Sequence, residues 1–409
     1  MQSARLLLAR IAAPRVTLAA IGLITVAVAS CSSSSATSAS SSSATSANPL
    51  AGTCLSGAAA PLTIVVGERS NVPSVQFPDA VESLITTAAT DRQPITLIRI
   101  DGKPKVFRLE KFSTSDQNSG AISDDISNYV TGVNELFEGP KMRAAAPQAD
   151  VLTALSLAAA ATPTGGNIIV IDSGLQTVAP LEYQVPGTLM SPPRDVVEFL
   201  RARNMIPPLS GRHVLLSGFG YTAAPQPSLE QSERENVAAQ WKAIVVVGGG
   251  CATVDPSPNT GAEVPGLPAV TTVPLPAPPT FSNCGTTVLS DAGSVGFKDG
   301  LSSFRDPVAA RSTLNQLAAT LSQGTEQITL IGSTSTEGGD AFNNTLSRKR
   351  ATAVKAVLVS LGIPGGRIKV IGDGAHYPGR VPDIGPDGQL LLAQAEQDRE
   401  VIVQLPQCQ

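Results

Sequence analysis

The stretch GSTSTEGGDAFNNTLSRKRA, Gly332 to Ala351, joins a loop of small polar residues to a helical pattern that carries Arg350. The run ITLIG, Ile328 to Gly332, precedes this loop and is typical of a buried strand. Beyond the loop, apolar residues recur at helical spacing until a Gly-Ile-Pro sequence ends the pattern. The sequence therefore predicts a strand, a glycine-containing loop and a helix from about Asn343 to Leu361.

Further predicted elements flank this unit. Asp306 and Pro307 favour the start of a helix, because Asp caps a first turn and Pro is tolerated at the first helical position. The segments RIKVIGDG and EVIVQL, the latter from Glu400 to Leu405, are typical of strands. Together with the segment that begins near CGTTVLS, these elements give the predicted order β-α-β-α-β-β.

This block, residues 281–409, resembles the OmpA-like C-terminal domain that also occurs in peptidoglycan-associated lipoproteins. The family pattern is a strand that ends in Gly-His-Thr-Asp, then a glycine, then Asn-x-x-Leu-Ser-x-x-Arg-Ala-x-x-Val. The positions that match the pattern here are Gly332, Thr334, Gly338, Asn343, Leu346, Ser347, Arg350, Ala351 and Val354. We refer to residues 281–409 as the C-terminal domain.

The resemblance implies noncovalent binding of the peptidoglycan stem peptide through the zwitterionic end of diaminopimelate. Arg350 is expected to hold a ligand carboxylate, because a guanidinium presents two parallel hydrogen-bond donors. Backbone N–H groups at the helix N-terminus would add further donors for an anion. The resemblance places Thr334, Ser335, Asn343 and Arg399 around the same site.

The chain departs from the family where the ligand's ammonium group needs a charged acceptor. The family's Asp is Ser335 here, its His is Ser333, and its late Asn-Arg-Arg has become Asp398-Arg399-Glu400. A charge-assisted hydrogen bond contributes roughly 1.5–3 kcal/mol, against about 1 kcal/mol for a neutral one. We therefore expect binding that is weaker by about one to two orders of magnitude. Glu337 and Asp340 are the carboxylates that would replace the missing one.

The start of the chain predicts export. MQSARLLLARIAAPRVTLAAIGLITVAVASC has a basic part, an apolar run from Val16 to Ala29 that is short for a membrane span, and small residues, the plan of a secretion signal. Its end resembles the lipobox of bacterial lipoproteins. That resemblance implies removal of residues 1–30 and a lipid that includes palmitate on Cys31, whereas an ordinary cleaved signal is the alternative. The serine-rich segment 31–53 is expected to be a flexible tether.

Composition and cysteine usage narrow the possible partners. Charged residues make up 15% of the chain and its formal net charge is -4, which argues against a nucleic-acid partner. An even number of cysteines beyond Cys31 in an exported chain favours disulfides. Three pairings are possible, and the positions favour the one in which each pair brackets a block: Cys54 with Cys251, and Cys284 with Cys408.

The first block, residues 54–254, alternates strand-like and helical segments. The runs LTIVV, ITLIRI, NIIVI and HVLLSG are apolar throughout, as expected of strands that are covered on both faces. Helical patterns such as ADVLTALSLAAAA and ENVAAQWKAIVVVGGG separate or follow them. The alternation predicts an α/β domain with a doubly wound parallel sheet. Residues 255–280 are proline-rich and are expected to be a semi-extended linker.

The first block resembles, more weakly, a von Willebrand factor A domain, in which the first strand runs into an Asp-x-Ser-x-Ser loop that holds a divalent ion. Here that loop is GERSN, Gly67 to Asn71, and Asp172 follows the third strand of the block. Arg69 in such a loop would repel a cation, so no functional metal site and no cofactor are expected. Asp172 is the weak candidate for a remnant of a metal site, and the alternative is that it closes a turn.

These features together predict an exported, two-domain cell-envelope protein that is anchored to the membrane by its N-terminal lipid and is not an enzyme. One alternative is an interaction or assembly module in which both ligand sites have decayed and an envelope protein is the partner of the first block. Another is an envelope enzyme with its active site around Arg69, Asp172 and Tyr221. A structural interpretation of Arg350 is an ion pair within its own domain, for example with Asp398.

Overall fold

Two β-sheets organise the computed structural model, which describes residues 52–408 except 76 and 78. The predicted signal segment and Cys31 lie outside the described residues, so the lipid anchor stays a prediction. Across the part of the chain that is described, no helix is both long and apolar enough to cross a membrane. The first sheet has six strands and belongs to the first block, and the second has four strands and belongs to the C-terminal domain.

The six-stranded sheet is parallel except at one edge. Its strand order is β3-β2-β1-β4-β5-β6, and only β3 runs antiparallel to its neighbour. The strands are β1 (Leu62–Val66), β2 (Ile95–Arg99), β3 (Lys105–Arg108), β4 (Asn167–Ile171), β5 (His213–Ser217) and β6 (Cys251–Val254). The direction in which successive strands are added reverses between β1 and β4, and in α/β sheets such a switch point is where ligands bind.

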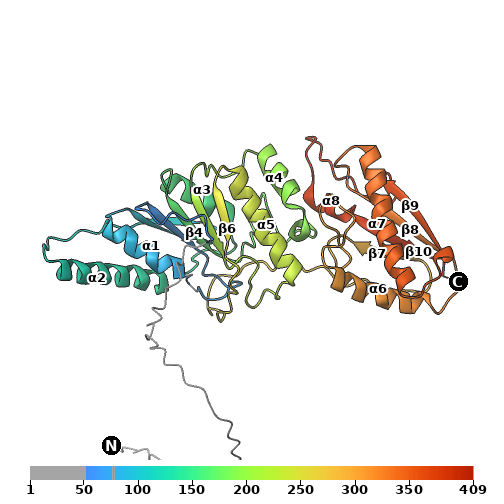
Figure 1. Cartoon of the computed structure of the whole chain (residues 1–409), viewed down its shortest axis with the longest axis horizontal. Coiled ribbons are helices and arrows are strands. Elements are labelled where there is room, and N and C mark those ends of the chain that lie inside the picture. Colours follow the sequence, from blue (N-terminus) through green and yellow to red (C-terminus); the bar gives the residue numbers. More distant parts are fainter. Residues whose placement is uncertain (1–51, 76, 78, 409) are drawn as a thin grey trace, which may run out of the picture. The chain divides into compact units, whose positions relative to one another are not determined.

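Helices cover both faces of this sheet (Figure 1). Residues that alternate along β1 point to different cores, because Ile64 packs with the first pair of helices and Val65 with the second group. The first pair is α1 (Asp79–Thr90) and α2 (Ser119–Glu138), and the second group is α3 (Val151–Ala161), η1 (Thr188–Met190), α4 (Pro193–Ala202) and α5 (Gln231–Val247). Burial on both faces explains the continuous apolar strands of the sequence, and the predicted parallel α/β sheet is confirmed.

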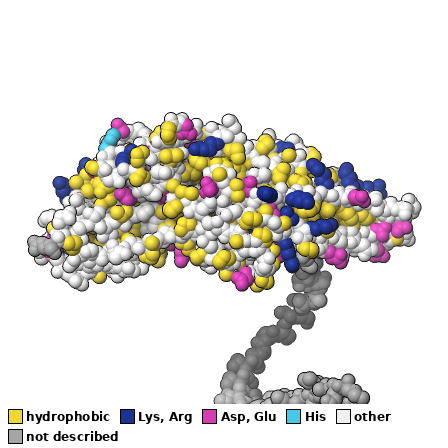
Figure 2. Space-filling view, turned by 180° about the vertical axis from the view of Figure 1, so that it is seen from behind, with side chains coloured by type: hydrophobic (Ala, Val, Ile, Leu, Met, Phe, Trp, Pro, Cys, Tyr) yellow, Lys and Arg dark blue, Asp and Glu magenta, His cyan; other side chains and the backbone are white. Residues whose placement is uncertain are grey.

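The edge strand β3 was not predicted from the sequence, because its polar residues hide the strand pattern. Lys105 and Arg108 are exposed, and such charges on an edge strand prevent pairing with another chain. Figure 2 shows charged side chains of both signs on the face it views, with lysines and arginines more numerous toward the right of the view than toward the left.

The four-stranded sheet has the order β7-β10-β8-β9, in which β10 is antiparallel to β7 and β8 while β8 and β9 are parallel. Its elements are β7 (Thr286–Ser290), α6 (Pro307–Leu321), β8 (Ile328–Ser333), α7 (Asp340–Ser360), η2 (Gly365–Arg367), β9 (Ile368–Gly374), α8 (Leu392–Gln397) and β10 (Glu400–Gln404). The predicted order is found, with the short helix α8 inserted before the last strand.

Two local features explain how α6 begins and how β8 packs against α7. Asp306 caps α6, because its side chain accepts the backbone N–H groups of the first turn, as the sequence predicted. A Cβ atom at Gly332 would lie 2.0 Å from the carbonyl oxygen of Ser347, so only glycine allows β8 to approach α7 this closely. The loop that follows β8 is thereby held against the first turns of α7.

The linker 255–280 forms no helix or strand where the structure describes it, yet it packs on the first block. Val273 is buried, and the side chain of Gln226 accepts its N–H at 2.6 Å and donates to its carbonyl at 3.0 Å. The side chain of Gln148 donates to the Thr271 hydroxyl at 2.9 Å. The linker is therefore a packed strap along the first block.

The two disulfides have the pairing that the sequence favoured. Cys54 is bonded to Cys251 and Cys284 to Cys408, with sequence separations of 197 and 124 residues. Each bond closes a long loop and therefore removes much conformational entropy from the unfolded chain. The second bond ties the ends of the C-terminal domain together, beside the edge strand β7.

We predict that replacing Cys284 and Cys408 together by serine lowers the free energy of unfolding of the C-terminal domain by about 2–5 kcal/mol. Denaturant titrations of the full chain, with and without a reducing agent, measure the effect. Reduction of the wild-type chain breaks this bond together with Cys54–Cys251, and it should lower the stability of the C-terminal domain to the same extent. Equal unfolding midpoints for the oxidised wild type and the double variant would contradict the prediction.

Candidate functional site

Arg350 lies on α7 with its side chain buried, at 4% exposure. Its Nε donates to the carbonyl of Leu301 at 3.1 Å, and its guanidinium carbon lies 5.0 Å from the centre of the Phe297 ring. Burial lowers the pKa of Arg350, and the charge of Asp291 partly offsets this effect. Arg350 is thus shielded from bulk water by its own domain and by the residues of the first block that line the same cavity.

Arg399 lies near Arg350 and is the centre of a cluster of ion pairs. Its Nη1 donates to Glu396 at 3.1 Å and its Nη2 to Glu337 at 3.0 Å, and Nη2 also bonds to Asp195 of the first block. Burial alone would lower the pKa of Arg399, but the surrounding carboxylates outweigh it and raise the pKa above its usual value. We call Arg399, Glu396, Glu337 and Asp195 the Arg399 cluster.

Arg350 and Arg399 line one cavity of about 190 Å³. The C-terminal domain contributes further charged and aromatic groups to its wall, and the first block contributes the rest. The other lining residues are Met190, Pro192, Pro193, Asn236, Asp291, Phe297, Lys298, Asp299 and Arg305. The structure therefore brings together the two arginines that the sequence assigned to a ligand site.

The other three predicted site residues lie in and next to the loop after β8 and do not line this cavity. Thr334, Ser335 and Asn343 are all buried, and the side chain of Asn343 donates to the carbonyl of Ser335 at 3.2 Å. The hydroxyl of Thr334 is buried and has no hydrogen-bond partner within the described part of the chain. Asn343 therefore holds the loop to α7, which is a supporting role for the position of the arginines.

The carboxylates near the site are only partly those that the sequence suggested. Glu337 is in the cluster, whereas Asp340 is exposed and pairs with His376 at 3.3 Å. Asp398 does not pair with Arg350, because it binds Arg380 at 2.9 Å. The expectation of an Arg350–Asp398 pair is therefore wrong, and the reason is that the loop before α8 brings its own arginine to Asp398.

Asp291 and Glu396 are two of the charged residues of the site that sequence reasoning missed. Asp291 is buried just after β7, where it accepts the N–H of Phe297 at 2.7 Å and pairs with Arg305 at 3.3 Å. Glu396 lies in the unpredicted helix α8. A polar residue directly after a strand was the available signal for Asp291, whereas α8 is too short to give a periodic pattern.

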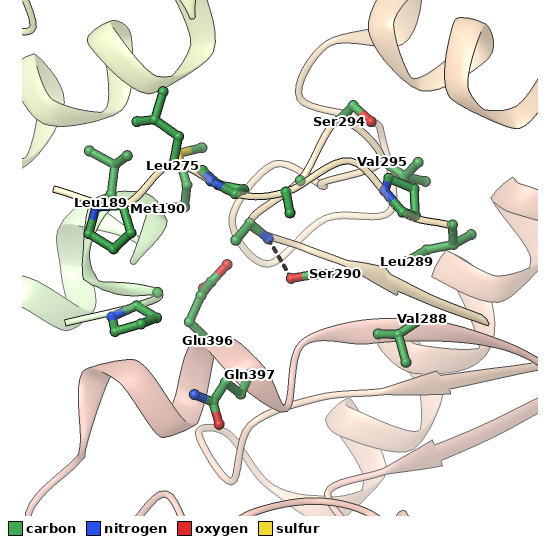
Figure 3. Close-up of a pocket in the computed structure, with 18 residues that line it drawn as sticks. Leu189, Met190, Leu275, Val288, Leu289, Ser290, Ser294, Val295, Glu396 and Gln397 are labelled. Atoms are coloured by element: carbon green, nitrogen blue, oxygen red, sulfur yellow. Dashed lines mark hydrogen bonds between the residues drawn. The ribbon is translucent and has the colours of Figure 1, made fainter. Parts of the chain in front are cut away.

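A second cavity, of about 220 Å³, lies among the linker prolines, η1, β7 and α8. Figure 3 shows the Glu396 side chain reaching between Leu189 and Met190 on one side and Ser290 on the other. Glu396 is buried, and one of its oxygens binds Arg399 while the other has no partner among the described residues. Glu396 therefore connects the Arg399 cluster to this second cavity.

The switch point of the six-stranded sheet contains a buried ion pair. Arg69 bonds to both oxygens of Asp172, and its Nη2 also lies 3.3 Å from the hydroxyl of Ser173. A Cβ atom at Gly67 would lie 1.7 Å from Asp172, so glycine leaves the room for this pair. Asp172 also closes a turn by accepting the N–H of Gly174 at 2.6 Å.

These residues do not fit a metal ion. The positive charge that faces Asp172 is a guanidinium, and a hard cation needs several oxygen ligands instead. Among the residues that the structure describes, no three His, Cys, Asp or Glu side chains are grouped so as to hold a metal. The resemblance of the first block to a von Willebrand factor A domain stays a prediction.

Tyr221, which an enzyme in the first block would use, lies at a different place. It lines a cavity of about 320 Å³ with Arg234 and Asn259, and its ring centre is 5.4 Å from the Arg234 guanidinium. Arg69 and Asp172 do not line this cavity. The structure therefore does not bring the three residues of that hypothesis into one site.

Two glutamates of the site hold protons tightly. Burial, with Asp195 close by, raises the pKa of Glu337 to about 8, although Arg194 and Arg399 act in the opposite direction. Burial and the charge of Asp291 raise the pKa of Glu396 to about 8. Because both values exceed the ordinary 4.5, the folded state binds these protons more strongly than the unfolded chain does.

We predict that the free energy of unfolding falls as the pH rises from about 4.5 to about 8 and levels off above that. The variant Glu337→Gln should show a smaller slope in this window, because one of the two protons no longer contributes. Denaturant titrations at several pH values measure the slope. Glu326→Gln, a change at an exposed position of the same domain, is the control and should keep the wild-type slope. An unchanged slope in Glu337→Gln would contradict the assignment.

Comparison with known proteins identifies part of the chain. The model of the OmpA family matches residues 297–382. No curated protein matches the sequence. Solved structures that are similar include the periplasmic domain of MotB from Helicobacter pylori, with 13% identity over 32% of this chain and 79% of that chain and a TM-score of 0.26.

Two further similar structures have names that refer to the cell wall. The peptidoglycan-associated lipoprotein of Burkholderia pseudomallei is 22% identical over 29% of this chain and 88% of its own, with a TM-score of 0.23. The cell wall anchor of the type VI secretion system from Pseudomonas aeruginosa is 20% identical over 29% of this chain and 78% of its own, with a TM-score of 0.24. The family match, together with the element order, shows that the C-terminal part of the chain carries an OmpA-like domain.

Proposed function

We propose that the protein is an exported, lipid-anchored component of the cell envelope whose C-terminal domain binds peptidoglycan noncovalently. The observation that carries this proposal is that Arg350 and Arg399 meet at one cavity of an OmpA-like domain. The resemblance to OmpA-like domains implies that the ligand is the stem peptide that contains diaminopimelate. The lipid on Cys31 is part of the proposal and rests on the sequence of the signal segment.

The charges around the cavity suit a zwitterionic ligand. Two guanidiniums within one cavity wall offer paired donors to a carboxylate, whose two oxygens match the donor geometry of arginine. Glu337 lies 3.0 Å from Arg399 and provides an acceptor for an ammonium group. We therefore assign to Glu337 the part that the family's Asp plays, with the ligand's ammonium group favouring the ionised form of a carboxyl group whose pKa burial raises to about 8.

We predict that Arg350→Ala weakens the binding of the full chain to purified peptidoglycan by about ten- to a hundredfold, because a charge-assisted hydrogen bond is lost. Co-sedimentation with peptidoglycan sacculi, in detergent, measures the bound fraction. Arg348→Ala is the matched control, since Arg348 is on the same helix, two residues away, and is exposed. Equal retention of wild type and Arg350→Ala, with both shown to be folded by circular dichroism, would defeat the proposal.

A second candidate function is an interaction or assembly module whose ligand sites have decayed. The observation that favours it is the burial of charged groups at both sites, where Arg69 is paired within the sheet and Arg350 is covered. Such a protein would use its surfaces, and not these cavities, to bind an envelope protein.

The substitution Ser335→Asp separates the two candidates. If the site is decayed because the family's Asp is missing, this change restores a charged acceptor and raises peptidoglycan binding at least tenfold. Because Ser335 is buried outside the cavity and Glu337 is already in place, we expect a change of less than about threefold. Titration with a soluble diaminopimelate-containing muropeptide measures the affinity, and Ser333→Ala controls for disturbance of the loop. A large gain would favour the decayed module.

A further inference from the structure

The covering of the two arginines comes from one helix of the first block. Helix α4 starts at Pro193, and the next two residues, Arg194 and Asp195, reach the C-terminal domain. Asp195 has no exposed surface, and its carboxylate bonds to Arg399. Met190 and Pro192, just before α4, and Pro193, its first residue, contribute to the wall of the arginine cavity.

Arg194 places a positive charge beside this negative one. Its Nη2 lies 3.2 Å from Glu337 and 3.6 Å from Asp299, while its Nε lies 3.4 Å from Asp195. Adjacent residues of one helix turn thus present an anion to Arg399 and a cation to Glu337. This is the same pattern of charges that a zwitterionic ligand with a neighbouring carboxylate and ammonium would present.

The contact is held in place and excludes water from the arginines. The side chain of Asn236 on α5 donates to the carbonyls of Leu189 and Ser191 at 2.9 and 3.1 Å, which fixes the segment before α4. Arg399 and Arg350 keep only 6% and 4% of their surface exposed. A ligand carboxylate therefore reaches the guanidiniums only when α4 moves away.

We propose that the Arg194–Asp195 pair of α4 is an internal competitor that closes the arginine site, and that a diaminopimelate-containing stem peptide binds in exchange for it. The proposal rests on the proposed function, since it concerns the regulation of the same site. The exchange replaces one carboxylate on Arg399 by another, so neither state leaves a buried charge unpaired.

The exchange makes the observed affinity for the stem peptide depend on the fraction of molecules in the open state, in which α4 has moved away from the arginines. A ligand that binds only the open state has its apparent affinity reduced by the fraction of molecules that are open. Most of the closing interaction belongs to Asp195, because it is fully buried, whereas the half-exposed Arg194 contributes little by itself. Removing the charge of Asp195 therefore raises the open fraction most.

The test compares full-chain Asp195→Asn with the wild type in calorimetric titrations with a soluble muropeptide that contains diaminopimelate. We expect Asp195→Asn to bind about tenfold more tightly or better. Glu198→Gln removes one negative charge from an exposed position of the same helix and is the matched control, with wild-type affinity. Arg350→Ala in the Asp195→Asn background should abolish the gain.

A second measurement uses the unaltered chain and does not depend on how a variant folds. Hydrogen–deuterium exchange at residues 188–200 should speed up when the muropeptide binds, because α4 leaves the site. Binding with equal affinity in wild type and Asp195→Asn, or binding without faster exchange at α4, would overturn the competitor and leave the proposed function standing. Absence of binding in the wild type and in Asp195→Asn alike would instead overturn the proposed function.

Discussion

The buried charge of Arg399 constrains how the first block and the C-terminal domain are arranged around the site. Its guanidinium is bonded to Glu396 and Glu337 of the C-terminal domain and to Asp195 of the first block. A buried charge without partners costs several kcal/mol, so these carboxylates have to be present wherever Arg399 is kept from water. The first block meets this requirement by placing the beginning of α4 on the cavity.

The Arg399 cluster is a network rather than a single ion pair, because several of its members contact more than one charged group. Glu396 joins Arg399 to the cavity along the linker, and Glu337 joins Arg399 to Arg194. Glu337 and Asp195 are two carboxylates beside one guanidinium, and their proximity is part of the reason why Glu337 keeps its proton. Protonation, the linker and the position of α4 are therefore physically connected at one place.

The expected peptidoglycan site and the weak candidate for a remnant of a metal site both contain an opposite charge that the chain itself supplies. At the switch point of the first sheet, Arg69 and Asp172 follow neighbouring strands, and the space for them depends on Gly67, so this pair is part of the core. At the arginine cavity, Asp195 lies on α4 of the first block and Arg399 lies just before β10 of the C-terminal domain, and the two meet where these parts of the chain touch. The first pair cannot be exchanged without opening a core, whereas the second needs only the separation of two surfaces. This difference is why the second site, and not the first, is the one we propose to bind a ligand.

The sequence by itself determined the buried strands, the parallel sheet and the element order of the C-terminal domain, it favoured the observed disulfide pairing, and its resemblance to a family pointed to the two arginines. Periodicity, caps and spacing are local, so Ile328–Ser333, α7 and the cap at Asp306 could be predicted from neighbouring residues. Only the tertiary structure decided which charges meet. Asp195 lies 204 residues before Arg399, and Glu396 lies in a helix too short for a periodic signal, so neither contact has a local trace. The physical reason is that an ion pair depends on distance in space and on burial, and a single sequence specifies neither until the chain has folded.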